Sequence, residues 1–178
     1  GDCPGLNPAI RGVVLRLAQE GVECLGMREG WKGMIEGKGD PLTAADVAWI
    51  VGKGGTVLGT SRTNPYKKEG GVEKVAETFK KLGLDALIAM GGEDTLGVAS
   101  KLFSERKLPV VGVPKTMDND LSATDYTFGF DTAATVAVDA AERLRDTGLS
   151  HRRVMLLEVM GRHAGWVALY TGLAAGAD

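Results

Sequence analysis

The chain has 178 residues, a net charge of −2 and 44% hydrophobic residues, a composition typical of a soluble globular protein. The lack of a basic excess argues against a nucleic-acid partner, and no apolar run is long enough to cross a membrane. The two cysteines, Cys3 and Cys24, form no C-x-x-C pair, which fits a reducing, cytoplasmic setting.

The first half of the chain shows short periodic segments separated by glycines. Helical periodicity begins at Asn7 or Pro8 and continues to Gln19. Alternation predicts a strand over residues 22–27, followed by an irregular stretch over 30–40. We expect a short helix over 43–51 and a short strand over 55–59.

The second half alternates more regularly between helical and apolar segments. Helices are predicted over 71–82, from 93 to about 107, over 128–145 and from about 164. Apolar runs over 84–90, 108–113 and 153–159 predict strands, and the first of these is expected to be fully buried. Strands that alternate with helices indicate an α/β fold with a parallel sheet.

The ends of the chain are abrupt. It opens on the loop-like G-D-C-P-G-L-N with no strand before it, and closes on G-L-A-A-G-A-D with no strand after it. We therefore expect a piece of a longer enzyme.

The turn G-G-E-D-T follows the apolar run 84–90. Its glycines let the backbone approach a ligand, and the helix that starts at Glu93 directs N–H groups toward the same point. Glu93 and Asp94 would repel a phosphate there unless a cation lay between them, and a magnesium ion resolves this conflict. Alternatively, the two acids only complement the helix dipole.

The stretch V-P-K-T-M-D-N-D, residues 113–120, follows the apolar run 108–113. Asp118 and Asp120 can divide the work, one accepting a hydroxyl proton and the other holding a metal ion. Lys115 can neutralise charge on a transferring phosphoryl group. The alternative is a solvated turn with Asn and Asp as ordinary turn residues.

A third turn, M-G-R-H-A-G, follows the run 153–159. Arg162 is expected to reach the same ligand crevice as the two preceding turns. Arginine suits phosphoryl charge because its guanidinium stays ionised and can donate two parallel hydrogen bonds. Arg153 begins that predicted strand, so we expect it at the opposite end of the sheet, at a different surface such as a subunit boundary. The chain has neither G-x-x-x-x-G-K-[ST] nor a G-x-G-x-x-G after a strand, which argues against a P-loop or dinucleotide site.

Six motifs then point to a family. They are, in order, G-D-C-P-G-L-N, T-S-R, G-G-E-D-T-L-G, G-V-P-K-T-M-D-N-D, T-F-G-F-D-T-A and E-V-M-G-R-H-A-G. Together they resemble 6-phosphofructokinase, over essentially the whole chain. The resemblance implies a parallel-sheet three-layer sandwich of the phosphofructokinase type, incomplete at both ends. It also implies a phosphoryl-donor-binding domain plus, from about residue 128, the start of a sugar-phosphate-binding domain whose C-terminal remainder is absent.

The resemblance assigns chemistry to the turns. It implies phosphoryl transfer to the 1-hydroxyl of fructose 6-phosphate in glycolysis, with Mg²⁺ as the cofactor. Asp118 would be the base, with Thr116 and Asp120 beside it. Glu93 would hold the magnesium ion with help from Asp120, and Arg162 would stabilise the transferring phosphoryl group.

The resemblance also assigns binding residues. Met160 and Gly161 would line the sugar site, and Gly1 and Arg62 match contacts to the phosphoryl donor. Arg153 matches a sugar-phosphate ligand contributed across a subunit boundary, which implies a homo-oligomer.

The donor depends on Asp94 and Lys115. The chain resembles the pyrophosphate-using members, which carry an acid at position 94, where ATP-using members carry glycine, and a lysine in P-K-T. A carboxylate at position 94 adds bulk and negative charge where the α-phosphate of ATP would pass. The resemblance therefore favours a diphosphate–fructose-6-phosphate 1-phosphotransferase. An ATP-dependent 6-phosphofructokinase and a non-catalytic, regulatory sugar-phosphate-binding subunit are the alternatives.

Overall fold

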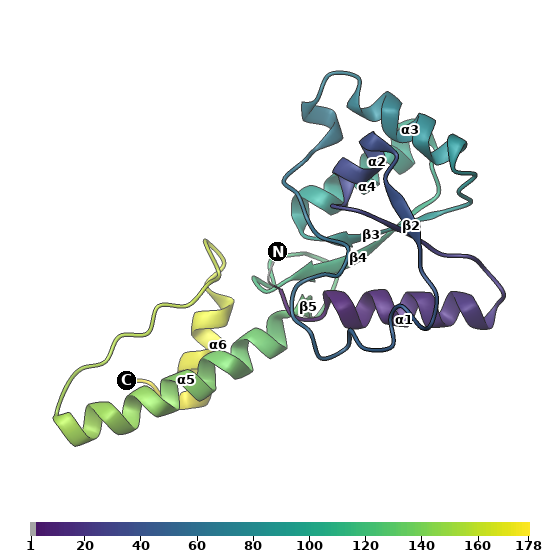
Figure 1. Cartoon of the computed structure of the whole chain (residues 1–178). Coiled ribbons are helices and arrows are strands. Elements are labelled where there is room, and N and C mark those ends of the chain that lie inside the picture. The colour runs from purple at the N-terminus through teal and green to yellow at the C-terminus, as the bar shows by residue number, and fades with distance from the viewer. Residues whose placement is uncertain (1–2) are drawn as a thin grey trace. The chain divides into compact units, whose positions relative to one another are not determined.

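A computed structural model of the chain describes residues 3–178 (Figure 1). The chain divides into two compact units, the first ending at Lys115 and the second spanning Thr116–Asp178. Within the described residues, no helix combines the length and the apolar character needed to cross a bilayer.

The first unit contains most of the secondary structure. Its elements are α1 (Leu6–Gln19), β1 (Leu25–Met27), α2 (Trp31–Glu36), β2 (Gly39–Pro41), the 3-10 helix η1 (Pro65–Lys67), α3 (Gly71–Lys81), β3 (Leu87–Gly91), α4 (Glu93–Arg106) and β4 (Val110–Thr116), whose last residue opens the second unit. The predicted helices 7–19, 71–82 and 93–107 are confirmed to within one residue at either end.

The strands β3 and β4 run parallel, and α4 connects them. Their register pairs Leu87 with Val110 and Gly91 with Pro114, and the order of the sheet is β3-β4-β5. This pairing confirms the predicted parallel sheet, because a helical crossover is what allows two successive strands to run in the same direction.

Two cores lie on opposite faces of β3, because successive side chains of a strand point to opposite faces. Ala89 packs with α2, α3 and α4 around buried side chains such as Val75 and Leu102. Met90 packs against the core formed by Ile10 and Val14 of α1 with residues 47 and 50. Helices therefore cover both faces of the sheet, as Figure 1 shows, and the predicted three-layer arrangement is confirmed in this unit.

The prediction of a fully buried strand over 84–90 is wrong in its start and in its burial. The strand starts only at Leu87, and the side chain of Ile88 is 37% exposed. An apolar run reports the average environment of a segment, whereas exposure of one side chain depends on what covers that face.

The region between α1 and η1 differs from its prediction. The strand β1 is only three residues long and pairs antiparallel with β2. The stretch 30–40, expected to be irregular, contains α2 and β2. Trp31 and Met34 are buried one helical turn apart, so the burial of one face stabilises a helix too short to show a clear period.

Two further predicted elements are not formed. Residues 43–51 form successive turns in which the N–H of Asp46 donates to the carbonyl of Thr43 at 3.1 Å, without becoming a helix. Residues 55–59 form no strand. Gly59 has φ +74° and its N–H donates to the carbonyl of Thr56, a turn geometry that extended pairing does not allow.

The second unit is dominated by a helical hairpin. It contains β5 (Phe128–Gly129), α5 (Phe130–His151) and α6 (Trp166–Ala175). Phe130 is fully buried and its ring meets Tyr170 of α6 edge-on at 5.1 Å between centroids. The guanidinium of Arg145 in α5 donates to the carbonyl of Ala175, the last residue of α6, at 2.9 Å, which is a second contact between the two helices.

The strand predicted over 153–159 is not formed. Residues 153–160 have no regular structure, and the side chains of Val154 and Leu156 are 99% and 94% exposed. An apolar alternating segment becomes a strand only when another strand pairs with it, and none does so among residues 3–178.

Candidate functional site

Two of the predicted turns meet at one edge of the sheet. Gly91 at the end of β3 is paired with Pro114 of β4, so G-G-E-D-T and the P-K-T segment leave neighbouring parallel strands at their carboxyl ends. This is the edge at which open α/β sheets bind ligands. The predicted placement of both motifs is confirmed up to Lys115, where the first unit ends.

The turn from β3 into α4 requires glycine. A Cβ atom on Gly91 would lie 2.5 Å from Cβ of Thr95, closer than two carbon atoms can approach. Gly92 is the N-cap of the 14-residue α4, and no side chain caps its first N–H groups. Those groups remain available to an anion, as the sequence predicts.

Asp94 lies in the first turn of α4 and has two partners. The Nδ2 group of Asn64 donates to its Oδ1 atom at 2.8 Å, and Nζ of Lys67 lies 3.8 Å from the same oxygen. The carboxylate side chain is 61% exposed, so it is oriented by these contacts and not enclosed.

Glu93 and Lys115 are differently placed at the same edge. Glu93 is exposed in the first turn of α4, while Lys115 is half-buried at the end of β4. Within residues 3–178, neither side chain makes a hydrogen bond or an ion pair, so both charges are unengaged. Arg62 is likewise exposed, in the irregular segment before η1. Its neighbour Ser61 donates to the carbonyl of Glu29 at 2.8 Å, which fixes the backbone there.

The turn after β4 carries the predicted base and is closed by a local hydrogen-bond network. The N–H of Asp118 donates to Oγ1 of Thr116 at 3.1 Å. The buried Thr127 donates through its N–H to Oδ1 of Asn119 at 3.0 Å and through its hydroxyl to the carbonyl of Thr116 at 2.5 Å. These bonds hold Asp118 half-buried at the end of the strand and leave Asp120 exposed.

The turn M-G-R-H-A-G precedes α6. Gly161 is buried with φ +145°, a backbone conformation that favours glycine, and its carbonyl accepts from the N–H of Ala164 at 2.9 Å. Arg162 has φ +52° and an exposed side chain, and Met160 is 68% exposed. The turn thus presents both side chains outward from the second unit.

The predicted position of Arg153 at the far end of a strand is wrong, because that strand is absent. Arg153 follows Arg152, the C-cap of α5, and its N–H donates to the carbonyl of Gly148 at 2.9 Å. The structure therefore places it at a helix end, with an exposed side chain.

A magnesium ion at this edge would need oxygen ligands from the acidic residues. Among the described residues no three His, Cys, Asp or Glu side chains cluster to hold a metal ion. Magnesium commonly takes one or two carboxylates and completes its coordination with water and substrate phosphate. The exposed carboxylate of Glu93 at this edge has the right chemistry for that role, and so does the exposed carboxylate of Asp120 in the second unit.

The structure thus assembles the site residues in two groups. Glu93, Asp94 and Lys115 share one sheet edge of the first unit, and Thr116, Asp118 and Asp120 share the turn that opens the second. The predicted donor contact Gly1 lies outside the described residues.

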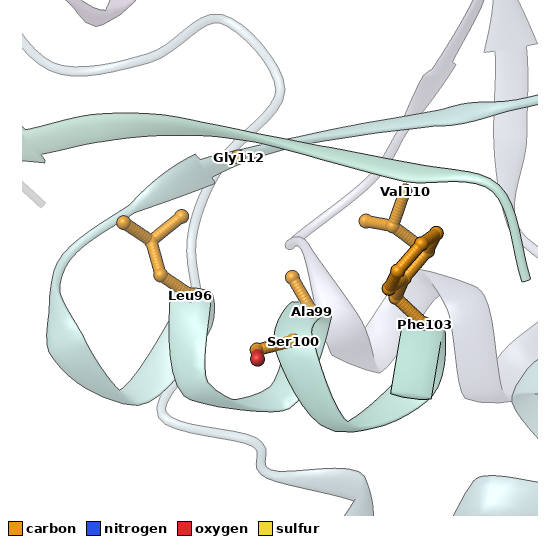
Figure 2. Close-up of a pocket in the computed structure, with 6 residues that line it drawn as sticks. All are labelled: Leu96, Ala99, Ser100, Phe103, Val110 and Gly112. Carbon is orange, nitrogen blue, oxygen red and sulfur yellow. The ribbon is translucent and has the colours of Figure 1, made fainter. Parts of the chain in front are cut away.

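A cavity lies elsewhere on the first unit. It has a volume of about 220 Å³ between α4 and β4 (Figure 2). Its lining residues are Leu96, Ala99, Ser100, Phe103, Val110 and Gly112. None of them is ionisable, and none is a predicted site residue.

Sequence reasoning missed two residues that shape these groups. Asn64 contacts Asp94 from thirty positions away, and Thr127 closes the turn around Asp118. The dipeptide Asn64-Pro65 signals a turn but not its partner. Thr127 lies in T-F-G-F-D-T-A, a motif that could have drawn attention to it.

Comparisons with known proteins cover the whole chain. A family model described as Phosphofructokinase matches residues 1–178. The protein named pyrophosphate–fructose 6-phosphate 1-phosphotransferase from Dictyoglomus thermophilum is 63% identical over 178 residues, covering 100% of this chain and 51% of that protein. ATP-dependent 6-phosphofructokinase 3 from Streptomyces coelicolor is 53% identical, covering 99% of this chain and 52% of its own length.

The chain spans about half the length of these curated relatives. Among solved structures, phosphofructokinase from Saccharomyces cerevisiae superimposes with a TM-score of 0.88 at 32% identity, covering 100% of this chain and 27% of that one. This similarity confirms the fold class predicted from the motifs.

Proposed function

The chain belongs to the phosphofructokinase family, and on that premise we propose that the protein containing it transfers a phosphoryl group from pyrophosphate to the 1-hydroxyl of fructose 6-phosphate, giving fructose 1,6-bisphosphate in glycolysis. The observation that carries the choice of donor is Asp94, whose carboxylate is oriented at the start of α4. The name of the relative at 63% identity supports the same donor.

Asp118 is the base in this proposal. Its carboxylate takes the proton of the 1-hydroxyl as that oxygen attacks the terminal phosphorus of pyrophosphate, the bridging P–O bond breaks, and phosphate leaves. The turn closed by Thr127 supports this role, because Asp118 is held through its N–H to Oγ1 of Thr116 at 3.1 Å. A base whose backbone is held in place has less freedom to lose on reaching the transition state.

The charges around the transferring group come from other residues of the chain. Arg162 and Lys115 offset the negative charge that the phosphoryl oxygens carry, and both cations lack a competing ion pair among residues 3–178. Glu93 and Asp120 are the carboxylates that would hold magnesium, which neutralises phosphate charge when it is bound.

Donor selectivity rests on space and charge at the start of α4. ATP has an α-phosphate beyond its β-phosphate, whereas pyrophosphate has only two phosphates and ends at the position of the β-phosphate. The carboxylate of Asp94 occupies that path with bulk and negative charge, and Lys115 adds a cation for a donor that has no adenosine to contact. Gly1 and Arg62 are assigned to the donor in the same proposal.

The remaining assignments concern the sugar phosphate and the assembly. The first part of the chain binds the donor, and the part from about residue 128 begins the sugar-phosphate domain, with Met160 and Gly161 lining the sugar site. Arg153 serves a neighbouring subunit's sugar phosphate, which makes the protein a homo-oligomer. Because its substrates are glycolytic metabolites, we assign the enzyme to the cytoplasm.

A coupled assay of the complete natural protein with each donor tests the proposal. We expect turnover of fructose 6-phosphate with pyrophosphate and little with ATP. Turnover with ATP alone would replace the proposal by the ATP-dependent enzyme, an alternative that the relative at 53% identity favours. A protein inert with both donors that still binds fructose 6-phosphate would be a regulatory subunit.

A further inference from the structure

The donor-selectivity residue has a side-chain partner in another part of the sequence. Asn64 donates from Nδ2 to Oδ1 of Asp94 at 2.8 Å, across a separation of thirty positions. The three-residue helix η1 begins directly after Asn64, so this contact joins the irregular segment that carries Arg62 to the first turn of α4.

The amide of Asn64 is itself held in one orientation. Its Oδ1 atom accepts from the N–H of Tyr66 at 2.9 Å, which makes Asn64 the side-chain N-cap of η1. With the oxygen engaged by the backbone, only the NH₂ group remains to face the carboxylate. The cap therefore directs the NH₂ group of Asn64 toward the carboxylate of Asp94.

The same segment is anchored a second time. The hydroxyl of Tyr66 donates to Oε2 of Glu105 at 2.9 Å, near the C-terminal end of α4, and Pro65 between the two contacts is buried. Asn64 is thus attached to α4 through its own contact with Asp94 and through Tyr66 at the opposite end of the helix. A side chain on a segment fixed in this way is a better positioning group than one on a free loop.

We propose that Asn64 is a positioning residue for donor selectivity: it holds the carboxylate of Asp94 in the orientation that admits pyrophosphate and obstructs ATP. The inference rests on the proposed function, since it assigns a role within the same donor site. Lys67, whose Nζ is 3.8 Å from the same oxygen and whose side chain is 79% exposed, is too mobile a partner to fix the carboxylate by itself.

The effect of losing the contact follows from its exposure. A carboxylate that is 61% exposed can turn toward water when Asn64 no longer holds it. Its rotation opens the path of the α-phosphate of ATP without removing the residue. The ratio of kcat/KM for pyrophosphate to kcat/KM for ATP should then fall, by about threefold to tenfold for one partly exposed hydrogen bond.

Asn64→Ser is the test variant in the complete protein. Serine keeps a side-chain acceptor for the N–H of Tyr66 and adds no charge, but its hydroxyl is too short to reach Asp94. Should that variant not fold, Asn64→Thr is used for the same reason. Arg106→Gln is the matched control, because it removes another exposed side-chain contact of α4, the one to Glu73 at 2.6 Å, and leaves both anchors of Asn64 in place; its donor ratio should stay within about twofold of wild type.

A double-mutant cycle with Asp94→Gly separates positioning from a general structural effect. Asp94→Gly should improve the use of ATP, and adding Asn64→Ser to it should leave the donor ratio unchanged, because the carboxylate to be held is gone. A purely structural role of Asn64 would alter the ratio equally in both backgrounds.

The outcomes distinguish the inference from the function on which it rests. If wild type uses pyrophosphate and Asp94→Gly improves ATP use, but Asn64→Ser and Asn64→Thr keep the wild-type ratio, the positioning role is overturned and the proposed function stands. The role is also overturned if Asn64→Ser lowers the ratio as much in the Asp94→Gly background as in wild type. If wild type uses ATP and not pyrophosphate, the proposed donor itself is overturned, and the role of Asn64 with it.

Discussion

Single side chains in this chain are organised by short local networks. The N–H of Asp118 donates a hydrogen bond to Thr116, and Thr127 donates hydrogen bonds to Thr116 and Asn119. All of these contacts lie within the second unit and span at most eleven positions of sequence. The backbone position of the proposed base is therefore a local property of one turn.

The first prediction is that Asp118→Asn removes the base while preserving the turn. The amide has almost the same shape but cannot take a proton, so kcat should fall by about 10²–10⁴-fold with a much smaller change in KM. Steady-state kinetics of the complete protein measure both quantities. An unchanged kcat would mean that another group accepts the proton.

The second prediction concerns the titration of Tyr66. Burial, followed by its hydrogen bond to Glu105, raises the pKa of Tyr66 from 10.0 to about 12. The folded protein then keeps the phenolic proton more firmly than the unfolded chain. This contribution to stability is fully present below pH 10 and is lost as the pH rises toward 12.

Ultraviolet titration of tyrosinate checks this expectation. The difference between the titrations of wild type and Tyr66→Phe isolates the signal of Tyr66. This subtraction is needed because the pKa of a second tyrosine, Tyr126, is also raised, chiefly by the nearby Tyr170. A difference spectrum with its midpoint at the ordinary tyrosine pKa would contradict the expected shift.

At the scale of elements, the β3-to-α4 turn is the critical connection. It delivers Glu93 and Asp94 to the sheet edge, and it does so because Gly91 allows the first turn of α4 to pack directly on the strand end. Further along the chain, Gly97 lies within the helix, and apart from its chain neighbours and the backbone of its own helix no atom lies within 4 Å of where its Cβ would be. The two glycines therefore offer a matched comparison.

The third prediction is that Gly91→Ala and Gly97→Ala have opposite effects on stability. Gly91→Ala should destabilise the protein by about 1–3 kcal/mol, since its methyl group would meet Thr95. Gly97→Ala should stabilise it by about 0.5–1 kcal/mol, because alanine favours the helix and has room. Thermal denaturation of the complete protein measures the two shifts in Tm, and shifts of the same sign would contradict the packing described for this turn.

At the scale of the whole molecule, the chain exposes apolar surface that a stable protein usually covers. Val154 and Leu156 lie two positions apart on the unpaired segment 153–160 and are almost fully exposed. Unpaired extended backbone with apolar side chains favours association.

The fourth prediction is that the 178-residue chain by itself self-associates through this segment. Val154→Glu combined with Leu156→Glu should lower the association, as measured by light scattering. Gln19→Glu combined with Ser104→Glu adds the same charge at exposed polar positions and is the control. Equal effects of the two pairs would show that charge, and not loss of apolar side chains, is responsible.

The sequence by itself determined three of the helices and the positions of the turns at the ends of β3 and β4. Helices α1, α3 and α4 satisfy their backbone within the segment and have a clear apolar period, so the periodicity located them to within one residue. The turn after β3 and the turn after β4 were located as well, because glycine, proline and acidic residues interrupt apolar runs there. The order of the motifs also identified the family.

Only the tertiary structure decided which segments pair and which side chains meet. A strand requires a partner, so 55–59 and 153–159 had the apolar pattern of strands without becoming any, while 39–41 became one by pairing with β1. The contact of Asn64 with Asp94 likewise depends on how η1 packs beside α4, and no local pattern encodes that distance. Local interactions depend on residues that are close in sequence, whereas strand pairing and long-range side-chain contacts form only when the chain folds.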